Sequence, residues 1–301
     1  MDFGFTDTQE ALYRAAEAFA RQALGQDAPM DAEAWATCGD QGLLGLCVDT
    51  SRGGQGHDAV TTARVLEGLG YGAQSAGRAF ALGAHLLAVC KPVEHYADND
   101  LHNGILDDLV SGRRVGAFAT TEAGAGSDVG AIATKATLDG SDVRLSGAKM
   151  FITNAPDAGV YLVTARTTSE QGAAAMSAYL VPRETEGLSV GSARPMMGLK
   201  GASIGEVRFD DCRIGAQHRL GPPGGGGQVV QYAMRWERAL LLAPQLGVMQ
   251  RQLEASVEHA RTREQFGKRI GAFQGVSHRI ARMDLRLEAA GGARVHLVEE
   301  R

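Results

Sequence analysis

The chain has 301 residues, of which 44% are hydrophobic and 22% charged, a balance typical of a globular protein and not of a disordered one. Its formal net charge of -5 and its isoelectric point near 5.9 argue against nucleic acid or an anionic membrane as the main partner. The amino-terminal sequence is not of the secretory type and no apolar run reaches membrane-spanning length, so we expect a cytoplasmic protein without a membrane partner.

Helical patterns dominate the first part of the chain. Thr6 is an expected N-cap with Gln9 three residues later, and apolar residues follow at helical spacing. Further helices are predicted over residues 31–46, 61–70, 76–90 and 100–111, with a loop at 51–58. The segment 76–90 is apolar nearly all round, which predicts a buried helix. Residues 1–115 should therefore form an all-α domain.

From Val115 onward the pattern changes to short runs of β-branched and apolar residues separated by Gly, Asp, Asn or Pro. The runs are VGAFAT, AIATKATL, DVRLSG, KMFIT, GVYLVTART, MSAYLVP, LSVG and GEVRFDDCRI, and LDGSDV predicts a hairpin. Such closely spaced strands disfavour the alternating βα pattern of a Rossmann fold. We expect a β-barrel-like or β-sandwich domain over residues 116–222.

The sequence GPPGGGG at 221–227 predicts a linker, after which helical spacing returns over 228–263. Pro244 should kink this helix or divide it in two. A further helix is predicted from Phe273 to Arg301, and its apolar Leu297 and Val298 have no later sequence to cover them. Residues 228–301 are therefore interpreted as an incomplete helical bundle, either truncated or covered by another subunit. The fold class is α+β, in the order helical, β, helical.

The loop FATTEAGAGSD, at 118–128, joins the first helical region to the β region. Gly124 and Gly126 allow close approach of the backbone to a ligand, and successive amide groups with nearby hydroxyls can form an anion-sized concavity. An ordinary strand-ending turn explains the same residues. The four cysteines lie at positions 38, 47, 90 and 212 without metal-site spacing, so buried reduced thiols are expected in place of a metal centre or disulfides.

Six motifs in sequence order resemble the acyl-CoA dehydrogenase family of flavoproteins. They are the opening DFGFTDTQE, GLLGLCVDTSRGGQG, TTEAGAGSDV, GAKMFITNAPDAGVYLV, MMGLKGASIGEVRFDDCRI and RTREQFGKRIGAFQ. The resemblance covers the whole chain, and it implies FAD as cofactor and an acyl-CoA or acyl carrier protein substrate. The sequences KMFITNAPDAGVYLV and MRWERALLLA are most similar to those of family members from polyketide-type natural-product pathways.

The same resemblance assigns residues to the flavin. It implies that Phe118 and Thr121 contact the flavin, and that Ser127 lies near the FAD pyrophosphate or the thioester ligand. Phe151 would pack on the isoalloxazine ring and Thr153 would bond near the flavin N5. Without the resemblance, Phe151 would be interpreted as an aromatic residue of the core.

A second part of the FAD site is implied at RTREQFG. In relatives these residues reach the FAD of a neighbouring subunit, so Arg263 would neutralise pyrophosphate charge while Gln265 and Phe266 border the adenosine. A helix end with cations against its dipole and Gly267 as its stop explains the same sequence. The first interpretation implies a homodimer or homotetramer.

The implied reaction is removal of the α-proton of an acyl thioester by a carboxylate with transfer of the β-hydride to flavin N5, which yields the trans-2-enoyl thioester. Most relatives carry this base on a later helix, but a subset has it at the position of Glu237, with Arg238 beside it to meet the substrate or its carrier. A pocket-lining or ion-paired glutamate is the alternative for Glu237.

Two other functions remain open. An acyl-CoA oxidase-like enzyme would pass electrons to oxygen, whereas the dehydrogenase would use an electron-transfer flavoprotein or a similar acceptor. Alternatively, the chain could be a non-catalytic subunit that completes the FAD site of a longer relative in a hetero-oligomer. Formation of peroxide at the rate of substrate turnover would exclude the dehydrogenase.

Overall fold

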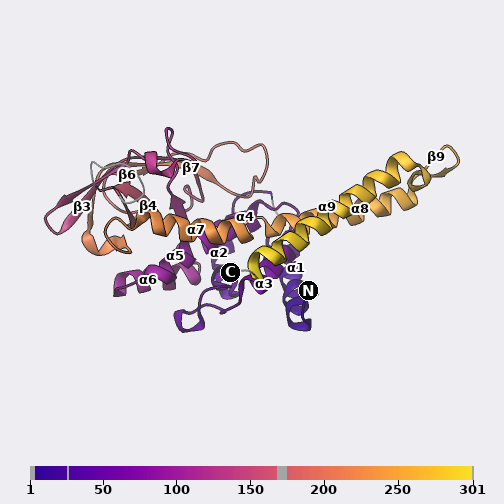
Figure 1. Ribbon diagram of the computed structural model, residues 1–301, viewed down its shortest axis with the longest axis horizontal. Helices are drawn as coiled ribbons and strands as arrows, with labels where there is room; N and C mark the ends of the chain where they lie inside the picture. Colours follow the sequence, from indigo (N-terminus) through magenta and orange to yellow (C-terminus); the bar gives the residue numbers. More distant parts are fainter. Residues whose placement is uncertain (1–3, 26, 168–174, 300–301) are drawn as a thin grey trace.

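The computed structural model describes residues 4–25, 27–167 and 175–299, and for residues 292–299 the backbone alone. The fold is α+β, with helices first, then a β domain and then helices again (Figure 1). The expectation about Leu297, Val298 and the end of the last helix at Arg301 concerns side chains and residues outside this description. None of the described helices is long and apolar enough to cross a membrane.

Six α-helices lie in the described part of the first region. They are α1 (Asp7–Ala23), α2 (Ala32–Asp40), α3 (Ala59–Gly72), α4 (Gly77–His85), α5 (Lys91–Tyr96) and α6 (Asp100–Val110). The predicted cap is confirmed, because the Thr6 hydroxyl accepts the amide of Gln9 at 3.3 Å and the Gln9 side chain accepts the amide of Thr6 at 3.0 Å. This reciprocal pair satisfies two amide groups that the first turn leaves without helical partners.

Two helix boundaries were predicted wrongly. The helix expected over 31–46 ends at Asp40, because Gly42 adopts a φ of 70° and the chain turns into a 3-10 helix at Leu43–Gly45. The helix expected to end at residue 90 continues as a π-helical turn, Leu86–Cys90, into α5. Pro92 is tolerated there because it lies in the first turn of α5, where little helical hydrogen bonding depends on its missing amide.

The β domain is one curled sheet around its own apolar core. Its strands are β1 (Gly116–Ala119), β2 (Lys135–Asp139), β3 (Asp142–Thr153), β4 (Val160–Arg166), β5 (Met176–Pro182), β6 (Leu188–Val190), β7 (Ile204–Gly215) and β8 (Arg219–Leu220). Their order is β6-β7-β3-β2-β4-β5-β8, with β1 parallel to β4. The predicted hairpin is confirmed at the paired residues Asp139 and Asp142, with Gly140 at a φ of 64°.

The runs DVRLSG and KMFIT were expected as two strands and are one, β3. Its pairing with β7 shifts register between Leu145 and Gly147 and again between Lys149 and Ile152. The second shift leaves Phe151 with a φ of 58°, so the strand bulges there and directs this side chain differently from its neighbours. All four cysteines are buried free thiols, as expected.

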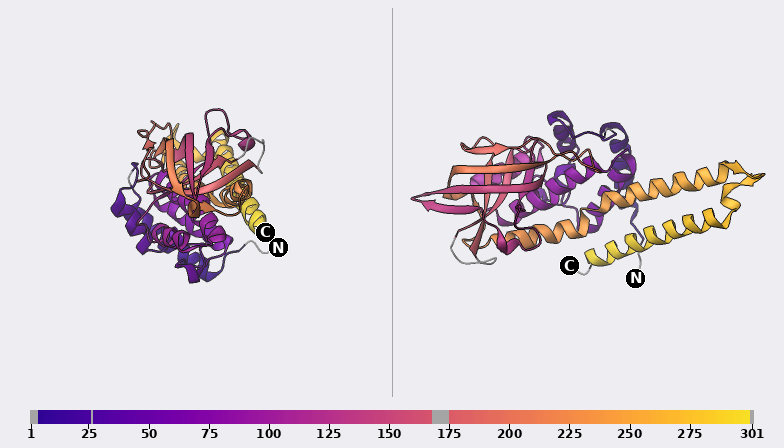
Figure 2. Two further views of the ribbon diagram at one scale, coloured as in Figure 1. Left: turned by 90° about the vertical axis from the view of Figure 1, so that its left-hand side faces the viewer. Right: turned by 90° about the horizontal axis from the view of Figure 1, so that it is seen from above.

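The last region contains α7 (Gly226–Leu240), α8 (Ala243–Thr262), the short strands β9 (Glu264–Gln265) and β10 (Lys268–Arg269), and α9 (Gln274–Glu299). The break at Pro244 is confirmed, because this proline lies in the first turn of α8. Helix α7 lies between the β domain and the first helices, whereas α8 and α9 form a long hairpin that projects away from the body, with β9 at its far end (Figures 1 and 2). Thus α7 lies where the regions meet.

A buried histidine joins these regions. His85 accepts the amide of Gly116 on Nδ1 at 2.9 Å, which leaves Nε2 as the donor to the carbonyl of Leu109 at 3.2 Å. Burial lowers the pKa of His85 to about 4, although the bond to Leu109 favours the charged form. The neutral ring therefore links α4, α6 and β1.

This histidine should make the fold sensitive to acid. Because the folded-state pKa lies below the ordinary 6.5, the unfolded chain binds the proton more readily, so stability is present above pH 6.5 and is lost as the pH falls toward 4. At pH 5 the expected loss is about 2 kcal/mol. The free energy of unfolding in urea, compared between the parent protein and His85→Gln at pH 7.5 and 5, measures this loss. An equal pH dependence in both proteins would contradict the assignment.

Candidate functional site

A cavity of about 210 Å³ lies where α4, β1, β3 and α7 meet. Its lining includes four of the residues that the resemblance assigned to the flavin, together with the assigned carboxylate. The lining residues are Ala84, Gly116, Phe118, Thr120, Thr121, Gly126, Val129, Phe151, Ile152, Thr153, Val230, Met234 and Glu237. The structure thus brings residues from four separate stretches of sequence to one place.

The loop after β1 forms one wall of the cavity. The amide of Met150 donates to the carbonyl of Thr121 at 2.8 Å, which fastens the loop to β3. A Cβ atom added at Gly124 or Gly126 would meet no atom within 4 Å, and neither glycine has a positive φ. Packing within the chain therefore does not require glycine at these positions, and the backbone is open to a ligand.

Phe151 forms the opposite wall. Its side chain is 58% exposed, so it is not an aromatic residue of the core, and its φ of 58° is strained for a bulky side chain. The guanidinium of Arg194 lies 5.3 Å from the centre of its ring. A strained, exposed aromatic ring that lines a cavity is a flat platform on which a ligand ring can stack.

Asn154, which sequence reasoning missed, holds the end of this wall. It is buried at a φ of 65°, its side chain donates to the carbonyl of Ala81 at 2.9 Å, and its amide donates to the carbonyl of Ser203 at 2.7 Å. Asparagine tolerates the left-handed conformation better than most residues, so an Asn directly after KMFIT was the available signal. These bonds fix Thr153 against α4.

Glu237 enters the cavity from α7. Val230, Met234 and Glu237 recur at intervals of four and three residues, so they share one face of the helix. Burial raises the pKa of Glu237 to about 7. Among the described residues none forms an ion pair or a hydrogen bond with its carboxyl group, so the alternative of an ion-paired glutamate is not supported. The next residue, Arg238, is exposed and does not line the cavity.

The other assigned residues lie outside the cavity. Ser127 is exposed on the loop between the lining residues Gly126 and Val129. Arg263, Gln265 and Phe266 lie at the tip of the α8–α9 hairpin, at the opposite end of the molecule from the β domain (Figures 1 and 2). Within one subunit these three cannot touch a ligand in the cavity.

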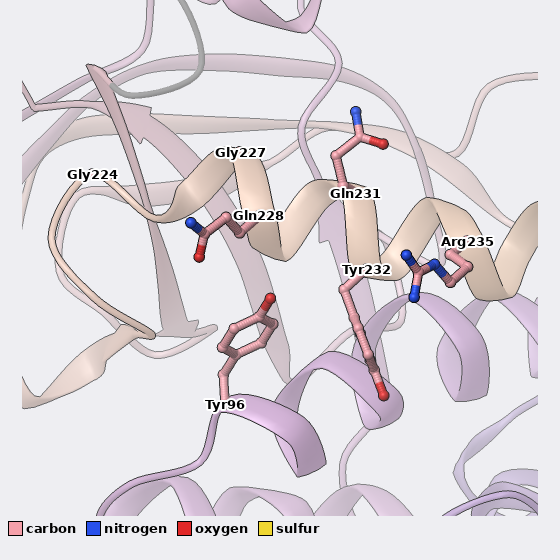
Figure 3. Close-up of a pocket in the computed structure, with 7 residues that line it drawn as sticks. All are labelled: Tyr96, Gly224, Gly227, Gln228, Gln231, Tyr232 and Arg235. Atoms are coloured by element: carbon pink, nitrogen blue, oxygen red, sulfur yellow. The ribbon is translucent and has the colours of Figure 1, made fainter. Parts of the chain in front are cut away.

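A second, larger hollow of about 570 Å³ lies along another face of α7. Figure 3 shows Gln228, Gln231, Tyr232 and Arg235 projecting from this helix, with Tyr96 of α5 beneath it. The ring of Tyr232 stacks on His95 at 4.2 Å between centroids. Among the described residues, no group of three or more His, Cys, Asp or Glu side chains could hold a metal ion.

The residues of the first cavity fit a flavin. Phe118 and Phe151 supply aromatic surfaces, Thr121 and Thr153 supply hydroxyl groups, and the open backbone at Gly126 leaves room for a bulky ligand. Fold and cavity together are those of a flavin-dependent oxidoreductase, and Glu237 adds a carboxyl group that has no ion pair or hydrogen bond to any described residue.

The chain belongs to the acyl-CoA dehydrogenase family, and it is an FAD-dependent oxidoreductase that acts on CH–CH groups. The N-terminal, middle and C-terminal domains of acyl-CoA dehydrogenase match residues 6–113, 117–212 and 224–299. The L-prolyl-[peptidyl-carrier protein] dehydrogenase of Pseudomonas fluorescens is 44% identical over 296 residues, which are 96% of this chain and 78% of that protein.

Solved structures agree with this assignment. The prolyl acyl carrier protein oxidase AnaB superposes with a TM-score of 0.94 at 31% identity, over 98% of this chain and 80% of that one. PigA with FAD and proline superposes with a TM-score of 0.93 at 36% identity, over 99% of this chain and 79% of that one. The expected fold class and cofactor are thereby confirmed.

Proposed function

We propose that this protein dehydrogenates an acyl thioester carried on an acyl or peptidyl carrier protein, with L-prolyl as the acyl group to test first. The observation that carries the proposal is the half-buried Glu237, unpaired among the described residues, in the same cavity as Phe118, Thr121, Phe151 and Thr153. The name of the relative from Pseudomonas fluorescens supports the carrier protein and the prolyl group, and the proline in the PigA structure supports the prolyl group.

In the proposed mechanism, Glu237 removes the α-proton of the thioester. Burial makes its carboxylate a stronger base than one in water, and a pKa of about 7 leaves a useful fraction deprotonated near neutral pH. Bound FAD supplies the acceptor for the hydride from the β-carbon. Phe118 and Phe151 would hold the ring, Thr121 and Thr153 would bond its polar edge, and Val230 and Met234 exclude water around the carboxylate.

The polar face of α7 would receive the carrier's phosphopantetheine arm. Its exposed residues recur at intervals of three and four and form a stripe beside the Glu237 face; they are Gln228, Gln231, Arg235 and Arg238. Two amides and two guanidinium groups suit an arm that carries amides and a phosphate. We include Arg238 and the loop residue Ser127 as substrate-binding residues on this basis.

Mixing the protein with different acyl thioesters gives the direct test. Anaerobic mixing with prolyl-carrier protein should bleach the flavin absorbance, and butyryl-CoA should bleach it more slowly. Arg238→Ala should raise KM for the carrier substrate by about tenfold with kcat nearly unchanged, because a contact distant from the reacting bond contributes mainly to binding. Arg213→Ala, an exposed arginine paired with Asp142, is the matched control. An FAD-loaded protein that no thioester bleaches would favour the non-catalytic subunit.

The tip of the α8–α9 hairpin supports a composite FAD site between subunits. Phe266 and Gly267 form its turn at φ values of 53° and 75°, and the Phe266 side chain is 92% exposed. A bulky residue is strained in this conformation and gains nothing from exposure, which favours a contact with another molecule. We propose that Arg263, Gln265 and Phe266 reach the FAD of a second copy in a homodimer or homotetramer.

The electron acceptor separates two candidate functions. We favour an electron-transfer flavoprotein or a similar acceptor, as the resemblance to acyl-CoA dehydrogenases implies. The similarity to the prolyl acyl carrier protein oxidase AnaB favours oxygen as the second candidate. Peroxide measured during aerobic turnover decides: one peroxide per oxidised bond identifies the oxidase, whereas a small yield with rapid reoxidation by electron-transfer flavoprotein identifies the dehydrogenase.

A further inference from the structure

We infer that Lys149 is a positioning residue for FAD: its ammonium group fixes the two flavin-facing segments, residues 118–121 and 151–153, relative to each other. The inference concerns FAD binding and does not depend on which thioester is oxidised. Lys149 lies on β3 and does not line the cavity, so it would act through the residues it bonds.

The contacts of Lys149 join the two walls directly. Its side chain is fully buried, and Nζ donates to the carbonyl of Thr120 at 3.0 Å and to Oε1 of Glu122 at 2.7 Å. Thr120 lines the cavity and precedes Thr121 on the wall formed by the loop. On the β3 side, the register shift that exposes Phe151 begins at Lys149. One ammonium group therefore holds both the loop and the start of the bulge.

Glu122 extends this connection along the chain. Its Oε2 accepts the amide of Ala133 at 2.6 Å, and its Oε1 accepts the amide and the hydroxyl of Thr134 at 3.0 and 2.6 Å. The side chain is only 8% exposed. The glycine-rich segment between residues 122 and 133 is thereby held at both ends, although its own glycines contribute little packing.

The cost of this pair argues for a role beyond stability. Burial lowers the pKa of Lys149 to about 8 even though Glu122 favours its charged form. Burial also raises the pKa of Glu122, but Lys149 and the bonds from Thr134 and Ala133 outweigh it and the net shift is downward. Well-packed apolar side chains often stabilise a fold as much as a buried ion pair does. What they cannot supply is a directed bond to the Thr120 carbonyl.

Two variants separate positioning from stability. Lys149→Met keeps the length of the side chain but leaves Glu122 without its cation. The double variant Glu122→Gln with Lys149→Met leaves no buried charge. The amide oxygen of Gln can still accept from Thr134, whereas its NH2 group then faces the amide of Ala133 and that one bond is lost. Val143→Ala creates a cavity in the core on the same strand. It is the matched control because it should lower stability without touching the contacts of Lys149.

Each apoprotein is titrated with FAD by fluorescence and melted by circular dichroism. We expect the Kd for FAD to rise by at least about tenfold in both Lys149 variants, with the double variant melting within a few degrees of the parent. Val143→Ala should melt lower with its Kd within twofold of the parent. A Kd within twofold of the parent in either folded Lys149 variant, or an equal rise in Val143→Ala, would overturn the inference.

Discussion

Glu237→Gln should reduce the rate of flavin bleaching by a thioester about 1000-fold while FAD remains bound, since general-base catalysis contributes about 10² to 10⁴ in rate. The amide has nearly the shape of the carboxylate but cannot accept the α-proton. Stopped-flow absorbance under anaerobic conditions measures the rate, and the flavin spectrum before mixing shows that the cofactor is present. Glu258→Gln, an exposed carboxylate on α8, is the control that should change neither.

The pH dependence gives an independent check on the same residue. Burial raises the pKa of Glu237 to about 7, and the deprotonated form is the active one. The bleaching rate should therefore rise with pH, fall about tenfold per unit below pH 7, and level off above it. A rate that is constant from pH 5.5 to 8 in the parent protein, or unchanged bleaching in Glu237→Gln, would assign the proton transfer to another group.

Loss of the hairpin tip should remove FAD from an otherwise intact subunit. Phe266→Gly relieves the strain at a φ of 53°, so the fold should be as stable as before or more so. The double variant Arg263→Ala with Phe266→Gly removes both the cation and the ring. Its Kd for FAD should rise by about 100-fold, since each contact contributes about 1–2 kcal/mol. Fluorescence titration and thermal melting measure the two effects.

Mixing two inactive variants tests whether this contact crosses between subunits. Glu237→Gln supplies an intact hairpin, and Arg263→Ala with Phe266→Gly supplies an intact carboxylate. In a mixed dimer one complete site would form, so about one quarter of the parent activity should return after subunit exchange. No recovery in a mixture shown to contain mixed assemblies would place hairpin and carboxylate in separate sites.

Sequence patterns predicted the architecture where the determining interactions are local. The Thr6 cap, the Pro244 break and the Asp139–Asp142 hairpin were all foreseen, because each depends on residues within a few positions of one another. The π-helical turn at Leu86–Cys90 was missed, since an apolar run carries no signal that distinguishes it from an α-helix.

Some features of the candidate site could likewise be predicted from the sequence, and others could not. The motifs were sufficient to predict the family and the cofactor, and they supplied the residues proposed for the flavin site. Three features required the folded structure: the exposure of Phe151 on a bulge, the lack of a partner for Glu237 among the described residues, and the contact of Lys149 with Glu122. Burial and long-range pairing are properties of the packed chain, because each depends on groups that the sequence separates and the fold brings together.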